Sequence, residues 1–229
     1  MRLGRIQNDF SAAGFDLVKA QGLEFIEICC NYDEHVHRLI DAKESIKKEI
    51  ARTGIDVSSV GRWNNNIQEN GVIVPERLSL YLELMETAIE LGAKVFVVGC
   101  NRDKSISLYR NYENAVSFFR TLIERADGRI KVAVEHCDWN NFITSPKQWE
   151  IVLDELPELS SNTTPRHTAT AVRITSPPSR IGLTAWPTCT SRAWFAQART
   201  PWTIRPQAWT TSTGPRSLPF CIAEATTAT

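Results

Sequence analysis

Two glutamates close predicted strands and are the side chains of this chain best suited to acid–base chemistry. Glu135 directly follows the apolar run Val132-Ala133-Val134, and Glu27 lies near the end of the segment Glu24–Ile28. A carboxylate at the end of a buried strand is costly unless it faces a cation or a polar partner. Glu135 is therefore the candidate catalytic residue, the alternative being a structural pair with a lysine. For Glu27 the alternation of the segment leaves two options, a substrate contact or a solvent-facing position.

Three further residues are candidates for substrate binding because they follow predicted strands. Arg62 and Trp63 follow the third strand, where the ring suits stacking on a sugar and the guanidinium suits a hydroxyl or phosphate. The alternative for Trp63 is that it only covers the mouth of a barrel. His136 is adjacent to Glu135 and so points to the other side of the strand, which predicts a supporting or structural role.

The elements that must position these residues alternate between strand and helix. Short apolar or β-branched runs are each followed by a helical pattern, which is typical of βα units and a parallel sheet. A continuous run such as Val95-Phe96-Val97-Val98 indicates a strand covered on both faces. The five predicted strands are Arg2–Ile6, Glu24–Cys29, Asp56–Gly61, Lys94–Cys100 and Lys131–Glu135.

The helix after Pro75 shows the pattern most clearly. Its apolar residues recur at spacings of four, three and four up to Ile89, with Pro75 in the first turn and Gly92 just past the end. Similar stripes predict helices that end before Gly54 and Gly128 and one that begins at Ser145-Pro146. Five units of roughly 32 residues fall short of the roughly 250 residues of a closed (βα)₈ barrel. The expected fold class is therefore α/β, of the (βα)₈ TIM-barrel lineage, with about five βα units over residues 1–159.

This order of motifs resembles the xylose isomerase-like TIM barrels, the sugar phosphate isomerase/epimerase superfamily. The matching segments are Gly14-Phe15-Asp16 with Gly22-Leu23-Glu24-Phe25-Ile26-Glu27-Ile28, then Ala93-Lys94-Val95-Phe96-Val97-Val98-Gly99, and Val132-Ala133-Val134-Glu135. The resemblance covers residues 1–159. It implies metal-dependent proton transfer next to a sugar carbonyl through an enediolate-like state.

The resemblance also implies a divalent metal ion (Mn, Mg, Co or Zn) held by four side chains at the ends of strands five to eight. Only the first of these is carried over, which makes Glu135 the expected metal ligand. The other three would lie beyond Leu159. With one ligand of four, the chain as written is expected to bind metal poorly and to be inactive.

Composition changes abruptly after Leu159. Residues 1–159 hold every lysine, with 19 basic and 25 acidic side chains, a formal charge of −6. Residues 160–229 contain seven arginines, a single acid, 16 threonines and eight prolines, a formal charge of +6. Prolines interrupt every candidate element of this segment. We expect it to be an irregular, basic, Pro/Thr-rich tail.

A shifted reading frame is one explanation of this tail. Codons made from the third base of one residue and the first two of the next allow Tyr-Asp-Pro-Ser over residues 162–166 and Ala-His-Val-His-Val-Lys-Gly over residues 186–193. Both resemble later motifs of the same family. The hypothesis is a one-base loss, or a two-base gain, near Leu159-Ser160; the alternative is a genuine disordered tail.

The overall composition excludes several function classes. The chain has 229 residues, no net formal charge and 42% hydrophobic residues, as expected of a folded protein without a nucleic-acid partner. The family resemblance implies a small-molecule sugar or sugar phosphate as partner instead. No apolar run approaches the roughly 20 residues of a membrane span, and no secretory signal is evident, so we expect no membrane partner and a cytoplasmic location. The six cysteines include no CxxC pair and are expected to be reduced. A homo-oligomer is compatible with these features.

Two alternative functions differ in class from the isomerase/epimerase hypothesis. One is an endonuclease IV-like DNA repair enzyme, although Gly61-Arg62-Trp63 stands where that resemblance requires histidines. The other is a non-catalytic half-barrel interaction module, whose open sheet edge would favour aggregation.

Resequencing the gene across the codons for Leu159 and Ser160 tests the reading-frame hypothesis. We expect the determination to reveal a missing base, or two extra ones, relative to a frame that continues the family motifs. An unaltered frame with no such alternative would establish the basic tail as genuine.

Overall fold

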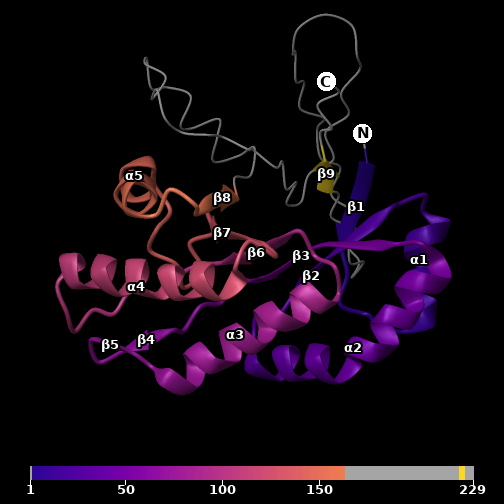
Figure 1. The fold of residues 1–229 in the computed structure, drawn as a ribbon, viewed down its shortest axis with the longest axis horizontal. Helices are drawn as coiled ribbons and strands as arrows, with labels where there is room; N and C mark the ends of the chain where they lie inside the picture. The colour runs from indigo at the N-terminus through magenta and orange to yellow at the C-terminus, as the bar shows by residue number, and fades with distance from the viewer. Residues whose placement is uncertain (1, 163–221, 225–229) are drawn as a thin grey trace, which may run out of the picture.

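A computed structural model describes residues 2–162 and 222–224, which form one seven-stranded sheet and a small hairpin (Figure 1). The strand order in the sheet is β8-β7-β6-β3-β2-β1-β9. Every neighbouring pair is parallel except β1 with β9. The strands are β1 Arg2–Ile6, β2 Phe25–Cys29, β3 Asp56–Arg62, β6 Val95–Val98, β7 Lys131–Glu135, β8 Ser160–Asn162 and β9 Ile222–Glu224.

Five helices follow the strands and confirm the predicted βα alternation. They lie in chain order along the sheet, each in contact with the next, and α2, α3 and α4 lie side by side beneath it in Figure 1. The sheet and its helices correspond to part of a TIM barrel, as predicted. The helices are α1 Ala12–Ala20, α2 Asp33–Thr53, α3 Pro75–Glu90, α4 Leu108–Ala126 and α5 Pro146–Glu155.

The helix boundaries lie close to the residues that the sequence indicates. Pro75 and Pro146 occupy the first turns of α3 and α5, where a missing N–H costs nothing. Ser145 and Gln148 form a reciprocal capping box at the start of α5. Gly54 ends α2 with a φ of 74°, a left-handed conformation that glycine adopts without strain.

The sheet continues slightly beyond the boundary expected at residue 159. Strand β8 pairs in parallel with β7, with Ser160 opposite Ala133 and Asn162 opposite Glu135. Within the described residues the sheet is open, with β8 and β9 as its edge strands. Most of the expected basic tail, and with it most of the segment to which the reading-frame hypothesis applies, lies outside the described residues.

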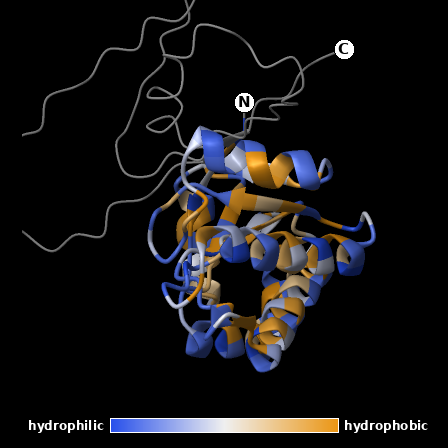
Figure 2. Ribbon diagram, turned by 90° about the vertical axis from the view of Figure 1, so that its left-hand side faces the viewer, coloured by the Kyte–Doolittle hydropathy of each residue, from blue (hydrophilic) through white to orange (hydrophobic). Residues whose placement is uncertain are grey.

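The main hydrophobic core lies between the sheet and the helices. It combines the outward-facing strand residues with the inner stripes of the helices, including the fully buried Phe96, Phe118 and Leu84. Hydrophobic residues concentrate in the strands and recur in stripes along the helices (Figure 2). None of the helices described here is long and apolar enough to cross a bilayer.

A short antiparallel hairpin interrupts the βα pattern between β3 and α3, and the sequence analysis did not predict it. It consists of β4 Gln68–Glu69 and β5 Val72–Ile73. Asn70 and Gly71 form its turn with φ values of 51° and 80°, the left-handed pair typical of a type I′ turn. The Asn-Gly dipeptide is the sequence signal that could have revealed it.

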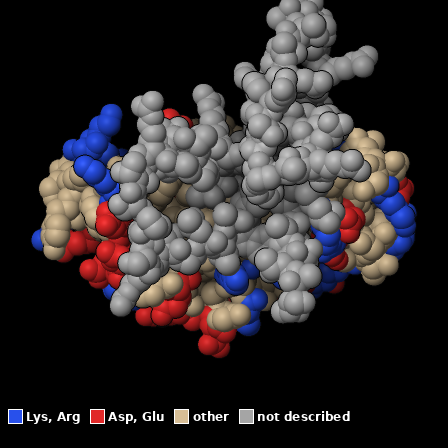
Figure 3. Space-filling view, turned by 90° about the horizontal axis from the view of Figure 1, so that it is seen from above, with Lys and Arg blue, Asp and Glu red and all other residues tan. Residues whose placement is uncertain are grey.

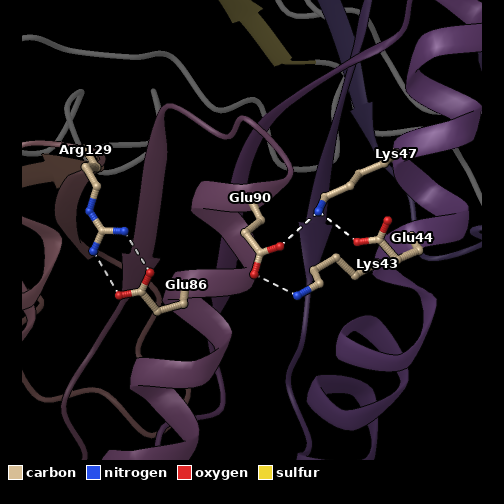
Figure 4. Close-up of polar contacts among 6 residues, drawn as sticks. All are labelled: Lys43, Glu44, Lys47, Glu86, Glu90 and Arg129. Carbon is tan, nitrogen blue, oxygen red and sulfur yellow. Dashed lines mark hydrogen bonds and ion pairs between the residues drawn. The ribbon is translucent and has the colours of Figure 1, made fainter.

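Charged side chains of both signs are visible around the rim of the face shown in Figure 3. Several of them join helices. Lys43 and Lys47 of α2 both bind Glu90 of α3, and Arg129, just beyond α4, forms a bidentate pair with Glu86 of α3 (Figure 4). Arg125 of α4 also donates to Glu86 at 3.0 Å. These ion pairs tie α2, α3 and α4 together on their outer surface.

We expect Glu86→Gln to lower the free energy of unfolding by about 1 kcal/mol at low salt, since it removes the anion shared by two arginines. The loss should shrink in 1 M NaCl, because salt screens exposed charges. Urea denaturation at both salt concentrations measures the effect. Glu83→Gln, at an exposed position one turn earlier on α3, is the control. An equal cost at both salt concentrations would contradict an ionic origin.

Candidate active site

The face of the sheet turned away from the helices carries the candidate site. Along β2, Phe25, Glu27 and Cys29 alternate with Ile26 and Ile28, and only the latter two belong to the core against the helices. Side chains alternate between the two faces of a strand, so Glu27 points to the inner face. The strand registers place Gly61, Val97 and Ala133 in one row across β3, β6 and β7.

Glu27 is a buried carboxyl group, with 1% of its surface exposed. Burial raises its pKa from 4.5 to about 8, against the opposing effect of a hydrogen bond with Ser59 of β3. Its Oε1 atom has no hydrogen-bond partner among the described residues. The solvent-facing option left open by the sequence is therefore wrong: Glu27 is held inside, largely as the neutral acid at pH 7.

Glu135 ends β7 and is also 1% exposed. Its Oε1 accepts a hydrogen bond from Nδ2 of Asn65 at 3.4 Å, and its carbonyl oxygen accepts one from Nδ2 of Asn141 at 2.9 Å. Its Oε2 has no partner among the described residues, and none of the ion pairs found there joins it to a lysine.

Desolvation raises the pKa of Glu135 well above its usual range, and the negative charge of Glu27 acts in the same direction. The hydrogen bond from Asn65 opposes both effects by stabilising the charged form. The two glutamates therefore influence each other although they lie on strands separated by β3 and β6. Two carboxyl groups that interact in this way titrate as a pair, which favours one negative charge over two.

Arg62 lies on the helix side of β3, away from the two glutamates. It is 2% exposed, its Nη2 contacts Oδ1 of Asp33 at 2.6 Å, and its guanidinium lies over the ring of Tyr81. Its guanidinium is thus buried and bound to protein groups, and it offers almost no exposed surface to a phosphate. Trp63 is half-buried beside the inner face, where a Cβ atom on Gly61 would lie 3.4 Å from its Cη2.

The ring of His136 stacks on Trp149 of α5, with ring centres 4.0 Å apart. This contact directs His136 toward the helix layer, whereas Glu135 faces the interior. The structure thus places Glu27, Trp63 and Glu135 on the face of the sheet that is turned away from the helices. The other two residues singled out from the sequence, Arg62 and His136, lie on the face covered by the helices. Roles in substrate binding remain predictions for all of them.

The described residues do not offer a complete metal site. No group of three or more His, Cys, Asp or Glu side chains that could hold a metal ion occurs in residues 2–162 or 222–224. The unpartnered Oε2 of Glu135 is an oxygen that a cation would satisfy, but a single carboxylate is a poor ligand set.

The asparagines that surround Glu135 were not predicted from the sequence. Asn65 and Asn141 are 1% and 7% exposed and lie in the segments after β3 and β7. Neither belongs to a recognisable motif. The only signal was the polar run Asn64-Asn65-Asn66 directly after a buried strand.

Comparison with known families identifies the class of protein. Residues 15–170 match the sequence model of the xylose isomerase-like TIM barrel. The chain belongs to this family, as its motifs predicted. Comparison with curated protein sequences gives no match.

Solved structures with a similar fold include sugar epimerases. The 3-keto-D-glucoside 4-epimerase YcjR of E. coli is 18% identical, with a TM-score of 0.58 over 72% of this chain and 69% of YcjR. The D-allulose 3-epimerase of Methylomonas sp. is 18% identical, with a TM-score of 0.57 over 72% of this chain and 63% of the epimerase. The IolI protein, solved with a zinc atom, is 17% identical, with a TM-score of 0.57 over 73% of this chain and 64% of IolI. This chain thus spans less than two thirds of the last two relatives, and the likeness concerns the fold.

The raised pKa of Glu27 predicts a pH-dependent effect of Glu27→Gln. The native protein retains a proton that the unfolded chain loses above pH 4.5, so the stability of the wild type falls as the pH rises from 4.5 to about 8. Glutamine has nearly the same shape and no charge. We expect Glu27→Gln to match the wild type near pH 4.5 and to exceed it by about 2 to 3 kcal/mol at pH 7.

Urea denaturation at several pH values measures this difference, with Glu83→Gln again as the control for loss of an exposed carboxylate. A difference between Glu27→Gln and the wild type that stays constant from pH 4.5 to 8 would show that Glu27 titrates normally.

Proposed function

We propose that this chain carries the proton-transfer half of a sugar isomerase or epimerase active site, with Glu135 as its catalytic residue. The observation that carries the proposal is the buried Oε2 of Glu135, which faces the interior without a hydrogen-bond partner among the described residues. Leaving a buried carboxyl oxygen unpaired is costly. A substrate proton is a partner that would satisfy it. Membership of the xylose isomerase-like family supports the same chemistry.

The two carboxyl groups divide the acid and base roles. In its charged form Glu135 takes the proton from the carbon next to the substrate carbonyl, and the electrons of the broken C–H bond move toward the carbonyl oxygen. Glu27, with a pKa of about 8, is largely protonated at pH 7 and supplies a proton to the enediolate-like intermediate. Delivery to the opposite face of the same carbon restores the carbonyl and gives epimerisation. Delivery to the former carbonyl carbon gives isomerisation, provided that the hydroxyl proton of the neighbouring carbon passes to the former carbonyl oxygen.

The proposed substrate is a small sugar or sugar phosphate in the cytoplasm. Its support is the fold shared with an epimerase solved in complex with D-allulose. Trp63 is the proposed stacking surface, because its half-buried ring lies beside the same inner face as the two glutamates. We also propose that copies of this chain associate into a homo-oligomer.

A divalent metal is part of the proposal only for a chain that contains the remaining ligands. Glu135 would be one ligand, and the metal would polarise the substrate oxygens. Because the other three ligands implied by the family resemblance would lie beyond Leu159, we propose that the chain as written is inactive. A chain with the reading frame restored after Leu159 is the proposed active form. The endonuclease and interaction-module alternatives gain no comparable support from the described residues.

Deuterium exchange tests this proposal. The chain as written and a version with the frame restored near Leu159-Ser160 are incubated in D₂O with D-allulose, D-fructose or D-tagatose, with and without Mn²⁺. We expect proton NMR to show deuterium next to the carbonyl only with the restored chain. Glu135→Gln should reduce its rate at least about 100-fold, the usual contribution of a general base.

Exchange by the chain as written would contradict its inactivity. Exchange by the restored chain that persists in Glu135→Gln would remove Glu135 from the catalytic role. The control for the restored chain is Glu83→Gln, which should exchange at the wild-type rate.

A further inference from the structure

Asn65 uses all of its hydrogen-bonding capacity in the interior, next to Glu135. Its Oδ1 accepts hydrogen bonds from the hydroxyl of Tyr81 at 3.2 Å and from the backbone N–H of Gly99 at 3.0 Å. Its Nδ2 donates to the carbonyl of Trp63 at 3.0 Å and to Oε1 of Glu135 at 3.4 Å. An asparagine amide has two donors and one oxygen that accepts twice, so every position is taken.

These partners fix the orientation of the Asn65 amide. The N–H of Gly99 can only donate and the carbonyl of Trp63 can only accept, so a flipped amide would place like groups together at both contacts. The flipped form would also turn an oxygen toward Oε1 of Glu135. The surroundings therefore aim a donor at one particular oxygen of Glu135 and leave Oε2 open.

The backbone at Gly99 leaves room for the side chains that contact Glu135. A Cβ atom on Gly99 would lie 2.6 Å from Nδ2 of Asn65 and 2.7 Å from Cγ of Asn141, closer than such atoms approach. Gly99 thus leaves the space in which two asparagines reach Glu135 from opposite loops. Asn141 fixes the backbone of Glu135, and its Oδ1 accepts the N–H of Cys100 at 3.2 Å.

The contact also extends outward through Tyr81, whose pKa is raised by burial so that its hydroxyl remains a donor. The ring of Tyr81 lies 5.1 Å from the guanidinium carbon of Arg62, which is paired with Asp33 at the start of α2. A chain of contacts therefore runs from the surface of α2 through α3 to the carboxyl group at the end of β7.

We propose that Asn65 is a positioning residue, whose oriented amide holds Oε1 of Glu135 and thereby presents Oε2 to the substrate. This inference rests on the proposed function of Glu135 and adds the residue that sets its geometry. It also assigns Arg62 an indirect role, as support for Tyr81, in place of a substrate contact.

The ¹³C chemical shift of the Glu135 carboxyl carbon reports the ionisation and the hydrogen bonds of this group. The test uses the whole chain labelled with ¹³C at the glutamate carboxyl carbons, with the Glu135 resonance assigned by its loss in Glu135→Gln. Asn65→Asp keeps the shape and both acceptor contacts but replaces the donor by an oxygen. We expect it to displace the Glu135 resonance at a fixed pH.

Asn111→Asp is the matched control. Asn111 is fully buried, its Oδ1 accepts from Gln68 and from the N–H of Asp103, and its Nδ2 donates to two backbone carbonyls, so the same substitution removes the same kinds of bond away from Glu135. It should leave the Glu135 resonance in place. A resonance unmoved in Asn65→Asp, or moved equally in Asn111→Asp, would overturn the proposal.

If Asn65→Asp does not fold, Asn65→Ala decides in the same way, because it removes the donor to Oε1 of Glu135 without adding a charge. The readout needs no turnover, so the two proposals fail separately. A displaced resonance without deuterium exchange by the restored chain would reject the function but keep the positioning role. An unmoved resonance together with loss of exchange in Glu135→Gln would reject the positioning role of Asn65 but keep the proposed function of Glu135.

Discussion

The two faces of the parallel sheet differ sharply, and this contrast governs the stability of the fold and the position of its buried carboxyl groups. One face is covered by helices and carries apolar side chains such as Phe96, Val98 and Val134. The other carries Glu27 and Glu135, which are as deeply buried as the core residues. Burying apolar groups stabilises the fold, whereas burying a carboxyl group costs free energy unless it is neutral or paired. The sheet therefore needs both its helix layer and the polar groups that surround the two glutamates.

Those polar groups come from loops rather than from the strands themselves. Asn65 lies beyond β3 and Asn141 beyond β7. Both contact Glu135, and both occupy the space that a Cβ atom on Gly99 would fill. Because each amide also binds backbone groups of other segments, the loops are fixed by the same bonds that hold the carboxyl group. The carboxyl ends of β3, β6 and β7 are thus joined by the same hydrogen bonds that accommodate Glu135.

The sequence predicts the regular elements well because their signals are local. Apolar runs, proline at helix starts and glycine at helix ends located β1 and β7 at their observed bounds and the ends of α2 and α3 within a residue or two. Glu135 could be singled out because it follows three apolar residues. The face of Glu27 could not be decided, since alternation alone does not say which side of a strand is the interior.

Other features depend on contacts between distant residues, and no local pattern encodes them. Asn65 lies 70 positions before Glu135 in the chain, so only the fold reveals the hydrogen bond between them. Likewise, Arg62 looks like a substrate contact in the sequence, but its position at the end of β3 turns it toward Tyr81 and Asp33. The Asn70-Gly71 hairpin is different, because its signal was local and was overlooked.

The unpaired oxygens of the two glutamates bear on whether this face was shaped for stability or for chemistry. A face under selection for stability alone would hold apolar residues, or carboxyl groups with every oxygen bonded, because each unsatisfied buried group lowers the free energy of unfolding. Here Oε1 of Glu27 and Oε2 of Glu135 lack partners among the described residues, while their neighbours Ser59 and Asn65 satisfy only one side of each carboxyl group. Groups kept at a cost to stability are characteristic of sites that bind or transform a ligand. The half-satisfied carboxyl groups are therefore consistent with the acid–base role proposed for them, since burial alone does not explain why one oxygen of each lacks a partner among the described residues.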